Sequence, residues 1–387
     1  MEDSFAIVLT GGGARAAYQV GVLRAIARRL PHAKLDIITG VSAGAINAAF
    51  LASRHAPLAN VVEELTKVWS NLQLKDVIRI DTRSLLRNAM AWTTKLASGG
   101  APVAPRVHGL VDTSPLRELL GRLFPENAEG QIAGIAENIV RCEPKAVSIT
   151  TLDYATGQTI TWVTGCDIEM WERPLRRSIQ AKLGIDHVMA SAALPFVFPA
   201  VRVGKHWHGD GGIRLSAPLS PALHLGATRM LAISTHYGLT FSEANEPQVV
   251  GYPPPAQILG QLVNAVFLDV MDEDTVRLER SNAFLRDLPP EQRHGYRIVD
   301  FAVIRPSEDL GRLAATYEPQ LPRTFRFLTR SLGTKETSNA DFISLLMFIP
   351  EYLRRLIEIG EADGEARIDE IARVVERGPV SQPGQTG

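Results

Sequence analysis

The sequence predicts an α/β protein in which a mostly parallel sheet is covered by helices on both faces. Residues 5–10 form a continuous apolar run without polar alternation, which is typical of a strand buried on both sides. The first 54 residues also alternate between strand-like and helix-like patterns, and this order favours parallel strands joined by helices.

The elements of the N-terminal part follow in order. A helix is expected over about residues 15–30, where a proline ends it. The second strand begins at Leu35 and leads into a turn at residues 40–44, and a second helix continues to about Arg54. Residues 60–72 have the periodicity of a further amphipathic helix.

The later elements are predicted from shorter runs. Residues 146–153 and 158–163 are rich in β-branched residues and flank a Thr-Gly turn, so we expect an antiparallel hairpin. Residues 185–193 are expected to be helical, and residues 230–235 form another apolar strand of the core.

Prolines gather within residues 241–256 and suggest a soft boundary in the chain. We therefore expect a main domain over residues 1–240 and a mainly helical extension over residues 241–377 that packs on it, with one more strand near 299–304. The last residues, 378–387, are polar and rich in glycine and proline, so a flexible tail is expected there.

The composition is that of a soluble globular protein. The chain has 387 residues, of which 45% are hydrophobic, and its net charge of -1 gives no global field that would attract nucleic acid. No stretch reaches the roughly 18 apolar residues that span a bilayer, so any membrane contact is expected to be peripheral. The acidic N-terminus does not resemble a signal peptide, and Cys142 and Cys166 do not make a disulfide framework; both observations predict a reduced, cytoplasmic protein.

The most informative motif is the G-x-S-x-G sequence Gly40-Val41-Ser42-Ala43-Gly44. An apolar run precedes it and a helix-like segment follows it. A strand, a strained turn and a helix are what a nucleophilic serine needs in order to stand exposed at the top of a sheet, and glycine at both flanks avoids crowding in such a turn. The context therefore predicts that Ser42 is a nucleophile.

The glycine run Gly11-Gly12-Gly13 lies between a predicted strand and a predicted helix. Backbone N–H groups at such a position suit an oxyanion hole. The same residues also satisfy the looser G-x-G-x-x-A pattern of dinucleotide binding, which would indicate an NAD-dependent oxidoreductase. That function needs an acidic residue at the carboxyl end of the second strand, whereas Asp36 begins that strand. The oxyanion interpretation is favoured, and the NAD alternative stays open.

A nucleophilic serine needs a base, and none of the nine histidines lies in a setting typical of a Ser-acid-His triad. The better candidate is Asp210, which Gly211 and Gly212 follow on a tight turn. If its carboxylate contacts the Ser42 hydroxyl, it can act without an imidazole, and partial desolvation would raise its basicity. Taken alone, Asp-Gly-Gly is more typical of a surface turn.

A metal site is the alternative for the same segment. His206, His208 and Asp210 alternate along a predicted strand, so they share one face and could converge on an ion. No further cluster of histidine or cysteine has metal-ligand spacing, and we interpret the two histidines as a polar strand edge.

Together, the three motifs resemble the patatin-like phospholipase family, and in particular its bacterial members. The match extends through the sequence that follows Gly11, and residues 190–195 resemble the family's Ala-Ser-x-x-x-Pro block. The resemblance covers about residues 5–236, and the helices after residue 256 more weakly resemble C-terminal extensions. Ala16 departs from the pattern, since many members carry glycine there.

The resemblance implies a three-layer α/β/α fold and a Ser-Asp dyad, with Ser42 as nucleophile and Asp210 as general base. It assigns oxyanion stabilisation to the main chain of the run Gly11, Gly12 and Gly13, with Arg15 supporting the loop. The N–H of Ala43 is expected to contribute, as the residue after such a nucleophile usually does. It also implies acyl-ester hydrolysis without a metal or organic cofactor.

The partners implied are a phospholipid or other acyl-ester lipid and, transiently, a membrane or micelle surface. Residues 85–96 and 342–349 could be interfacial or lid segments. Core packing is the favoured interpretation of both. A catalytically silent lipid-binding protein is a further alternative, and the intact serine, aspartate and glycines argue against it. The sequence does not indicate the head group, the chain length or the oligomeric state.

Overall fold

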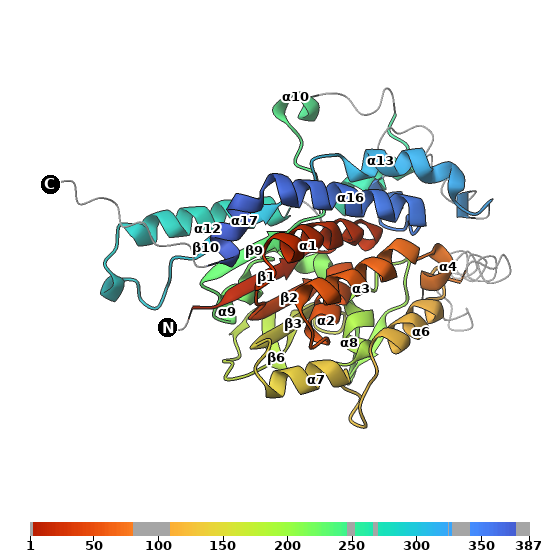
Figure 1. Ribbon diagram of the computed structural model, residues 1–387. Coiled ribbons are helices and arrows are strands. Elements are labelled where there is room, and N and C mark those ends of the chain that lie inside the picture. Colours follow the sequence, from red (N-terminus) through yellow and green to blue (C-terminus); the bar gives the residue numbers. More distant parts are fainter. Residues whose placement is uncertain are drawn as a thin grey trace.

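A ten-stranded mixed sheet runs through the centre of the computed structural model, with helices on both faces (Figure 1). The structure describes residues 3–79, 109–245, 252–265, 270–323, 325–326 and 341–376. Its strands are β1 (Phe5–Leu9), β2 (Ile37–Val41), β3 (Ala146–Asp153), β4 (Thr159–Gly165), β5 (Glu172–Arg173), β6 (Arg176–Gln180), β7 (Val201–Val203), β8 (His206–Asp210), β9 (Arg229–Ile233) and β10 (Asp300–Ile304).

The helices within the described residues range from single turns to seventeen residues. They are α1 (Ala17–Arg29), α2 (Ala43–Ala52), α3 (Leu58–Asn71), α4 (Leu74–Val77), α6 (Ser114–Leu123), α7 (Ala133–Val140), α8 (Ile185–Ser191), α9 (Ser220–His224), α10 (Phe241–Ala244), α11 (Pro255–Val263), α12 (Val270–Arg286), α13 (Leu310–Tyr317), α15 (Asp341–Ser344), α16 (Pro350–Ala366) and α17 (Ile368–Val375). A short 3-10 helix, Gly13–Ala16, precedes α1.

The sheet is parallel where the sequence predicts it to be. The strand order is β10-β9-β1-β2-β3-β4-β6-β5, and the first five strands of this order are parallel to one another. β3 and β4 form the predicted antiparallel hairpin, in register from Ala146 opposite Gly165 to Leu152 opposite Thr159. The predicted α/β fold with a mostly parallel sheet is therefore confirmed.

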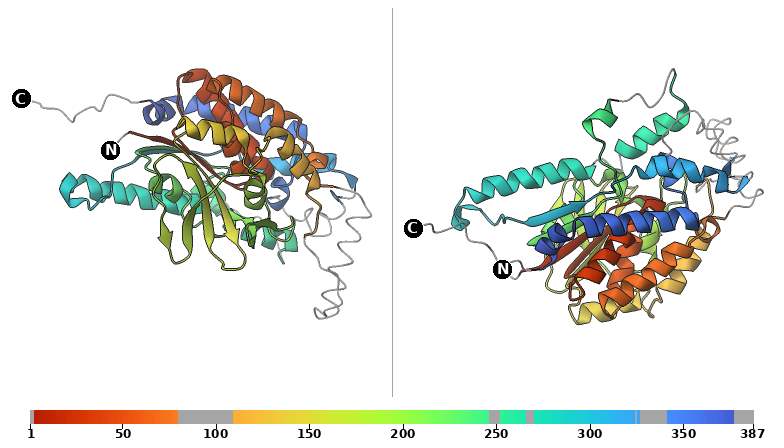
Figure 2. Two further views of the ribbon diagram at one scale, coloured as in Figure 1. Left: turned by 90° about the horizontal axis from the view of Figure 1, so that it is seen from below. Right: turned by 45° about the horizontal axis from the view of Figure 1, so that its top comes forward.

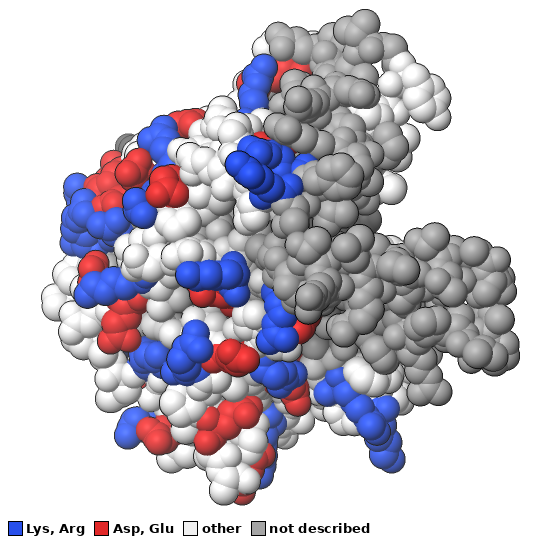
Figure 3. Space-filling model, turned by 90° about the vertical axis from the view of Figure 1, so that its right-hand side faces the viewer, with Lys and Arg blue, Asp and Glu red and all other residues white. Residues whose placement is uncertain are grey.

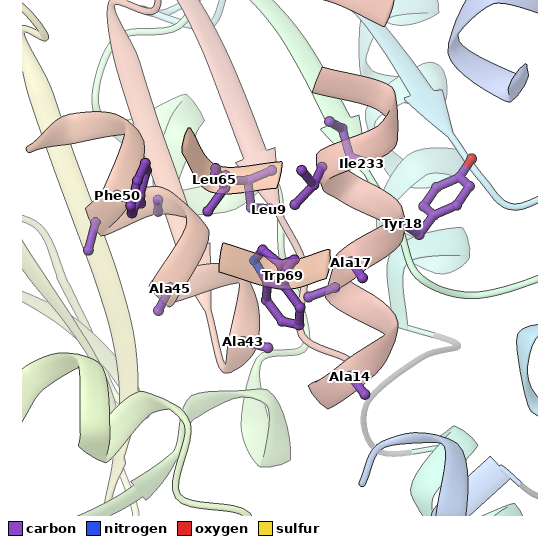
Figure 4. Close-up of a cluster of buried hydrophobic side chains, with 14 of the residues drawn as sticks. Leu9, Ala14, Ala17, Tyr18, Ala43, Ala45, Phe50, Leu65, Trp69 and Ile233 are labelled. Carbon is purple, nitrogen blue, oxygen red and sulfur yellow. The ribbon is translucent and has the colours of Figure 1, made fainter. Parts of the chain in front are cut away.

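The residues of β1 show why the strand has no polar alternation. Phe5, Ile7 and Leu9 belong to a large hydrophobic cluster with α1, α2, α3 and α16, whereas Ala6 and Val8 belong to a second cluster with α9 and α12. Both faces of the strand are thus buried, as the apolar run predicts. Figure 4 shows part of the larger cluster, with Phe50 and Trp69 among its members.

The segment after residue 240 adds to the same sheet and to the same core. β10 pairs in parallel with β9, so one edge of the central sheet comes from this segment. α16 lies along α1, as two views show (Figures 1 and 2), and Gly21 lets the helices approach closely, since a Cβ there would lie 2.0 Å from the carbonyl oxygen of Ile357. The division into domains at residue 240 stays a prediction.

The two cysteines differ from the expectation. Cys142 and Cys166 form a disulfide, so the prediction that both are reduced is wrong for this structure. Cys142 follows α7 and Cys166 follows β4, and the N–H of Cys166 donates to the carbonyl of Lys145 at 2.8 Å. The pairing of β3 with β4 brings these two chain segments together, and the spacing of the cysteines in the sequence does not reveal it. The cytoplasmic location stays a prediction that the cysteines no longer support.

Candidate active site

Ser42 stands at the turn between β2 and α2 with a backbone φ of 56°, a left-handed conformation that costs energy for any residue but glycine. Both flanking glycines are required by close backbone contacts. A Cβ at Gly40 would lie 2.6 Å from the carbonyl oxygen of Gly44, and one at Gly44 would lie 2.3 Å from that of Leu9. The strand, strained turn and helix that the motif predicts are therefore all present.

A second serine holds this turn in place. The backbone N–H of Ser42 donates to the Ser191 hydroxyl at 2.9 Å, and that hydroxyl donates to the carbonyl of Thr150 at 2.7 Å. Ser191 is fully buried at the end of α8, so the bridge is shielded from water. No sequence pattern reveals this role of Ser191, although the resemblance of residues 190–195 to a family block indicates that the segment matters.

Asp210 ends β8 beside Ser42 because β2 and β8 share one edge of β3. The pairing of β2 with β3 ends at Val41 opposite Thr150, and the pairing of β8 with the same edge begins one residue later, where Asp210 lies opposite Thr151. The N–H of Asp210 donates to the carbonyl of Ala193 at 3.0 Å. The segment that ends α8 thus contacts both candidate dyad residues.

The carboxylate of Asp210 is fully buried. One oxygen, Oδ1, accepts a hydrogen bond of 2.8 Å from the N–H of Gly212, and Oδ2 has no hydrogen-bond partner of good geometry among the described residues. Burial raises the pKa of Asp210 to about 7, and the nearby Ser42 hydroxyl and the N–H of Gly212 oppose that rise. A carboxylate with such a pKa is a far stronger base than a solvated one.

Each glycine of the run Gly11, Gly12 and Gly13 lies so close to a neighbouring residue that a Cβ atom would not fit. A Cβ at Gly11 would lie 2.9 Å from the Cβ of Ser42, one at Gly12 would lie 2.3 Å from Oγ1 of Thr235, and one at Gly13 would lie 2.2 Å from the carbonyl oxygen of Leu345. Gly12 and Gly13 also have positive φ values, 149° and 55°. No residue with a side chain could hold this loop so close to the serine.

The predicted oxyanion donors do not all take the same position. Gly12, Gly13 and Ala43 line one cavity together with Ser42 and Asp210, whereas Gly11 packs against the Ser42 side chain and is not among the cavity's lining residues. The next N–H along the loop, that of Ala14, already donates to the carbonyl of Leu345 at 2.9 Å. The best-placed candidate donors are therefore Gly12, Gly13 and Ala43.

Arg15 supports the loop from behind through residues far away in the sequence. Its guanidinium forms a buried ion pair of 2.6 Å with Asp341 and donates to the Ser344 hydroxyl at 2.6 Å. Asn264 donates to the other oxygen of Asp341, also at 2.6 Å. Arg15 thus ties the loop to α15 and does not face the cavity.

The cavity at Ser42 is almost wholly apolar. Among the described lining residues the polar side chains are Ser42, Asp210 and Trp69. The indole N–H of Trp69 donates a hydrogen bond to Oδ1 of Asn47 at 2.8 Å. The walls come from α2, α3, α6, the loop after α8 and the residues after α15, and include Ile46, Phe50, Leu65, Val68, Leu72, Leu116, Leu119, Leu120, Leu123, Leu194, Phe198, Leu345, Leu346 and Phe348. The cavity therefore presents apolar walls beside the serine, which suit an apolar group.

The two candidate interfacial segments have different outcomes. Within residues 342–349 the side chains from Ile343 onward are buried, as the core-packing interpretation predicts, and three of them also line the cavity. Residues 85–96 lie outside the described residues.

The described residues show no arrangement that fits the metal-site alternative or the NAD alternative. His206 contacts Asp153 at 2.8 Å and His208 contacts Thr151 at 3.1 Å, so the proposed metal ligands have separate partners. No group of three or more histidine, cysteine, aspartate or glutamate side chains within the described ranges could hold a metal ion. Asp36 accepts from the N–H of Phe5 at the amino end of the sheet, opposite to the glycine run, and so cannot meet a ribose bound there.

A family comparison agrees with this geometry. The model of the patatin-like phospholipase family matches residues 7–223. The chain belongs to the patatin-like phospholipase family. Its fold is accordingly that of the family, an α/β fold whose central sheet is mostly parallel. Among the described residues no helix combines the length and the apolar character that crossing a bilayer requires.

Relatives and solved structures give a more distant comparison. The chain is 26% identical over 231 residues to the calcium-independent phospholipase A2-gamma of Mus musculus and 25% identical over 229 residues to that of Homo sapiens. In each case the match takes in 56% of the chain and only a quarter of the relative's length. Two solved structures are also similar. VipD from Legionella pneumophila is 14% identical with a TM-score of 0.36, and the match covers 95% of this chain and 67% of VipD. Human GIVD cytosolic phospholipase A2 in complex with methyl gamma-linolenyl fluorophosphonate is 12% identical with a TM-score of 0.43, and the match covers 97% of this chain and 58% of that protein.

Proposed function

We propose that this patatin-like protein is a lipid acyl hydrolase that cleaves carboxylic esters through a Ser42–Asp210 dyad. The observation that carries the proposal is the apolar cavity whose described polar lining converges on these two side chains. An acyl chain fits such walls, and its ester carbonyl would then lie at the serine. Membership of the family agrees with this activity.

In the proposed mechanism, each step uses a group of this chain. The Asp210 carboxylate accepts the proton of the Ser42 hydroxyl as the serine oxygen attacks the ester carbonyl. The N–H groups of Gly12, Gly13 and Ala43 stabilise the oxyanion that forms. The alcohol leaves with the proton that Asp210 gives back, and an acyl-enzyme remains on Ser42. Water then attacks the acyl group with Asp210 as base, and the fatty acid is released.

The substrate class follows from the shape and polarity of the cavity. Its walls present aliphatic and aromatic side chains and no charged group other than Asp210 among the described residues, which suits an acyl chain and not a polar head group. We therefore propose phospholipids or other acyl-ester lipids as substrates, met at a membrane or micelle surface. The head group would lie outside the apolar part of the cavity.

A fluorophosphonate probe tests the proposal directly, because it labels only a serine that its surroundings have activated. The wild-type protein should label at Ser42 and should hydrolyse a short p-nitrophenyl ester and a phospholipid. The Ser42→Ala variant should do neither, while its folding is unchanged by circular dichroism. Absence of labelling in the well-folded wild type, together with retained lipid binding, would instead support a catalytically silent lipid-binding protein.

A further inference from the structure

Phe196 combines two properties that are rare for an aromatic residue. Its backbone φ is 64°, and its side chain is 76% exposed. A bulky residue in the left-handed region is strained, and such strain persists only where the surrounding structure enforces it. Exposure of an aromatic side chain to water adds a further cost. Neither property contributes to the stability of the fold, so a function for the position has to be sought.

The loop around Phe196 is rigidly built. Pro195 and Pro199 restrict the backbone on either side. The N–H of Phe198 donates to the carbonyl of Leu194 at 2.9 Å, and the N–H of Leu110 donates to the carbonyl of Phe196 at 3.1 Å. The exposed ring is therefore presented by a fixed backbone and is not part of a fraying segment.

The position of the loop connects it to the cavity. Leu194 and Phe198 line the apolar cavity that ends at Ser42, and Phe196 lies between them in the chain but faces solvent. Leu110, which is hydrogen-bonded to the loop, is itself 40% exposed. An exposed apolar pair thus lies beside the cavity walls.

We propose that Phe196, together with Leu110, inserts into the lipid surface from which an acyl chain passes into the cavity. The inference rests on the proposed function, because it assumes that the cavity receives a lipid. An acyl chain that leaves a lipid phase stays out of water only if the protein surface beside the cavity touches that phase. A rigid ring next to two cavity-lining residues meets this requirement.

Two arguments favour a lipid surface over a protein partner. Two apolar side chains are far too few for a stable protein interface, which buries about 1,200–2,000 Å². They suffice for reversible contact with a lipid surface, where binding scales with the apolar area inserted. The net charge of -1 gives no general attraction to an anionic surface, so apolar insertion and not charge should dominate the contact. Basic and acidic side chains also intermix over the described part of the face shown in Figure 3.

Sedimentation with phosphatidylcholine vesicles tests the proposal with Phe196→Ala and a matched control. Phe284→Ala on α12 removes an equally exposed ring, 74%, from a helix that does not line the cavity. The Phe196 variant should partition onto vesicles about tenfold more weakly than the wild type, and the Phe284 variant should match the wild type. High salt should change neither result. Equal partitioning of the Phe196 variant and the wild type would overturn the proposal.

Activity measurements separate this inference from the proposed function. The Phe196→Ala variant should keep wild-type fluorophosphonate labelling and wild-type activity on a dissolved p-nitrophenyl ester, and should lose activity only on vesicle lipid. An equal loss on both substrates would make Phe196 part of the site wall and would contradict insertion. Phe196→Gly relieves the backbone strain, so its weakened binding cannot be ascribed to unfolding. If the wild type itself does not label, the proposed function fails, while the vesicle result still tests the insertion.

Discussion

Replacement of Asp210 by asparagine should separate the two consequences of burying this carboxyl group. Asparagine has nearly the same shape, and its oxygen can still accept from the N–H of Gly212, but it can neither carry the charge nor accept the serine proton. General-base catalysis typically contributes 10²- to 10⁴-fold, so labelling of Ser42 by a fluorophosphonate should slow by about that factor. In the wild type the labelling rate should rise with pH and level off above about 7, where Asp210 is ionised.

The same substitution should change how stability depends on pH. Burial raises the pKa of Asp210 from its ordinary value of 3.8 to about 7, so the folded protein keeps a proton that the unfolded chain has already lost. Below pH 3.8 the group has no effect on stability. As pH rises toward 7, the carboxyl group destabilises the folded state by about 1.4 kcal/mol per pH unit, or about 4 kcal/mol in all. Above pH 7 the destabilisation stays constant.

Urea denaturation at a series of pH values measures this difference. The free energy of unfolding of the wild type, minus that of Asp210→Asn, should fall by roughly 2 kcal/mol between pH 5 and pH 7. The comparison cancels the titration of all other groups that the substitution leaves unaffected. A constant difference across this range, with a labelling rate that does not vary with pH, would refute the reasoning about Asp210.

Three further substitutions test other parts of the site. Ser191→Ala should leave the N–H of Ser42 without its acceptor and slow fluorophosphonate labelling by about tenfold or more, whereas Ser148→Ala, which removes a buried hydroxyl without a hydrogen-bond partner among the described residues, should not. Asp341→Ala should lower the free energy of unfolding in urea by about 3–5 kcal/mol because it leaves the Arg15 guanidinium buried and unpaired, and a loss below 1 kcal/mol would contradict this. Ile46→Trp should fill part of the cavity and lower kcat/KM for a long-chain p-nitrophenyl ester more than for the acetate; equal losses would argue against an acyl chain at this wall.

The local parts of the site could be predicted from the sequence because their physics is local. The turn at Ser42 needs glycine at 40 and 44, and the contacts at both positions show why. The apolar run of β1 predicts a doubly covered strand, and its residues divide between the two clusters as expected. Asp210 is the better candidate base from the residues alone, and the family resemblance strengthens this prediction, since Asp-Gly-Gly by itself is more typical of a surface turn.

The remaining features depend on chain segments that the sequence does not place together. The Ser191 hydroxyl meets Ser42 across 149 residues, and Asp341 meets Arg15 across 326. No periodicity or motif spacing encodes such contacts, because they arise from strand order and helix packing. The disulfide between Cys142 and Cys166 was missed for the same reason: the hairpin brings the two cysteines together, and counting them does not.

The contacts of residues 341–348 show that the candidate active site is not confined to the residues that the family model matches. The family model ends at residue 223, yet Leu345, Leu346 and Phe348 form part of the cavity wall. The carbonyl of Leu345 accepts a hydrogen bond from the N–H of Ala14, so this N–H is not among the proposed oxyanion donors, which are those of Gly12, Gly13 and Ala43. Because Asp341 also neutralises Arg15 behind the same loop, this segment fixes the loop by hydrogen bonds, by charge and by packing. Residues 341–348 therefore contact the glycine loop and form part of the cavity wall, and they do so from outside the region that the family model matches.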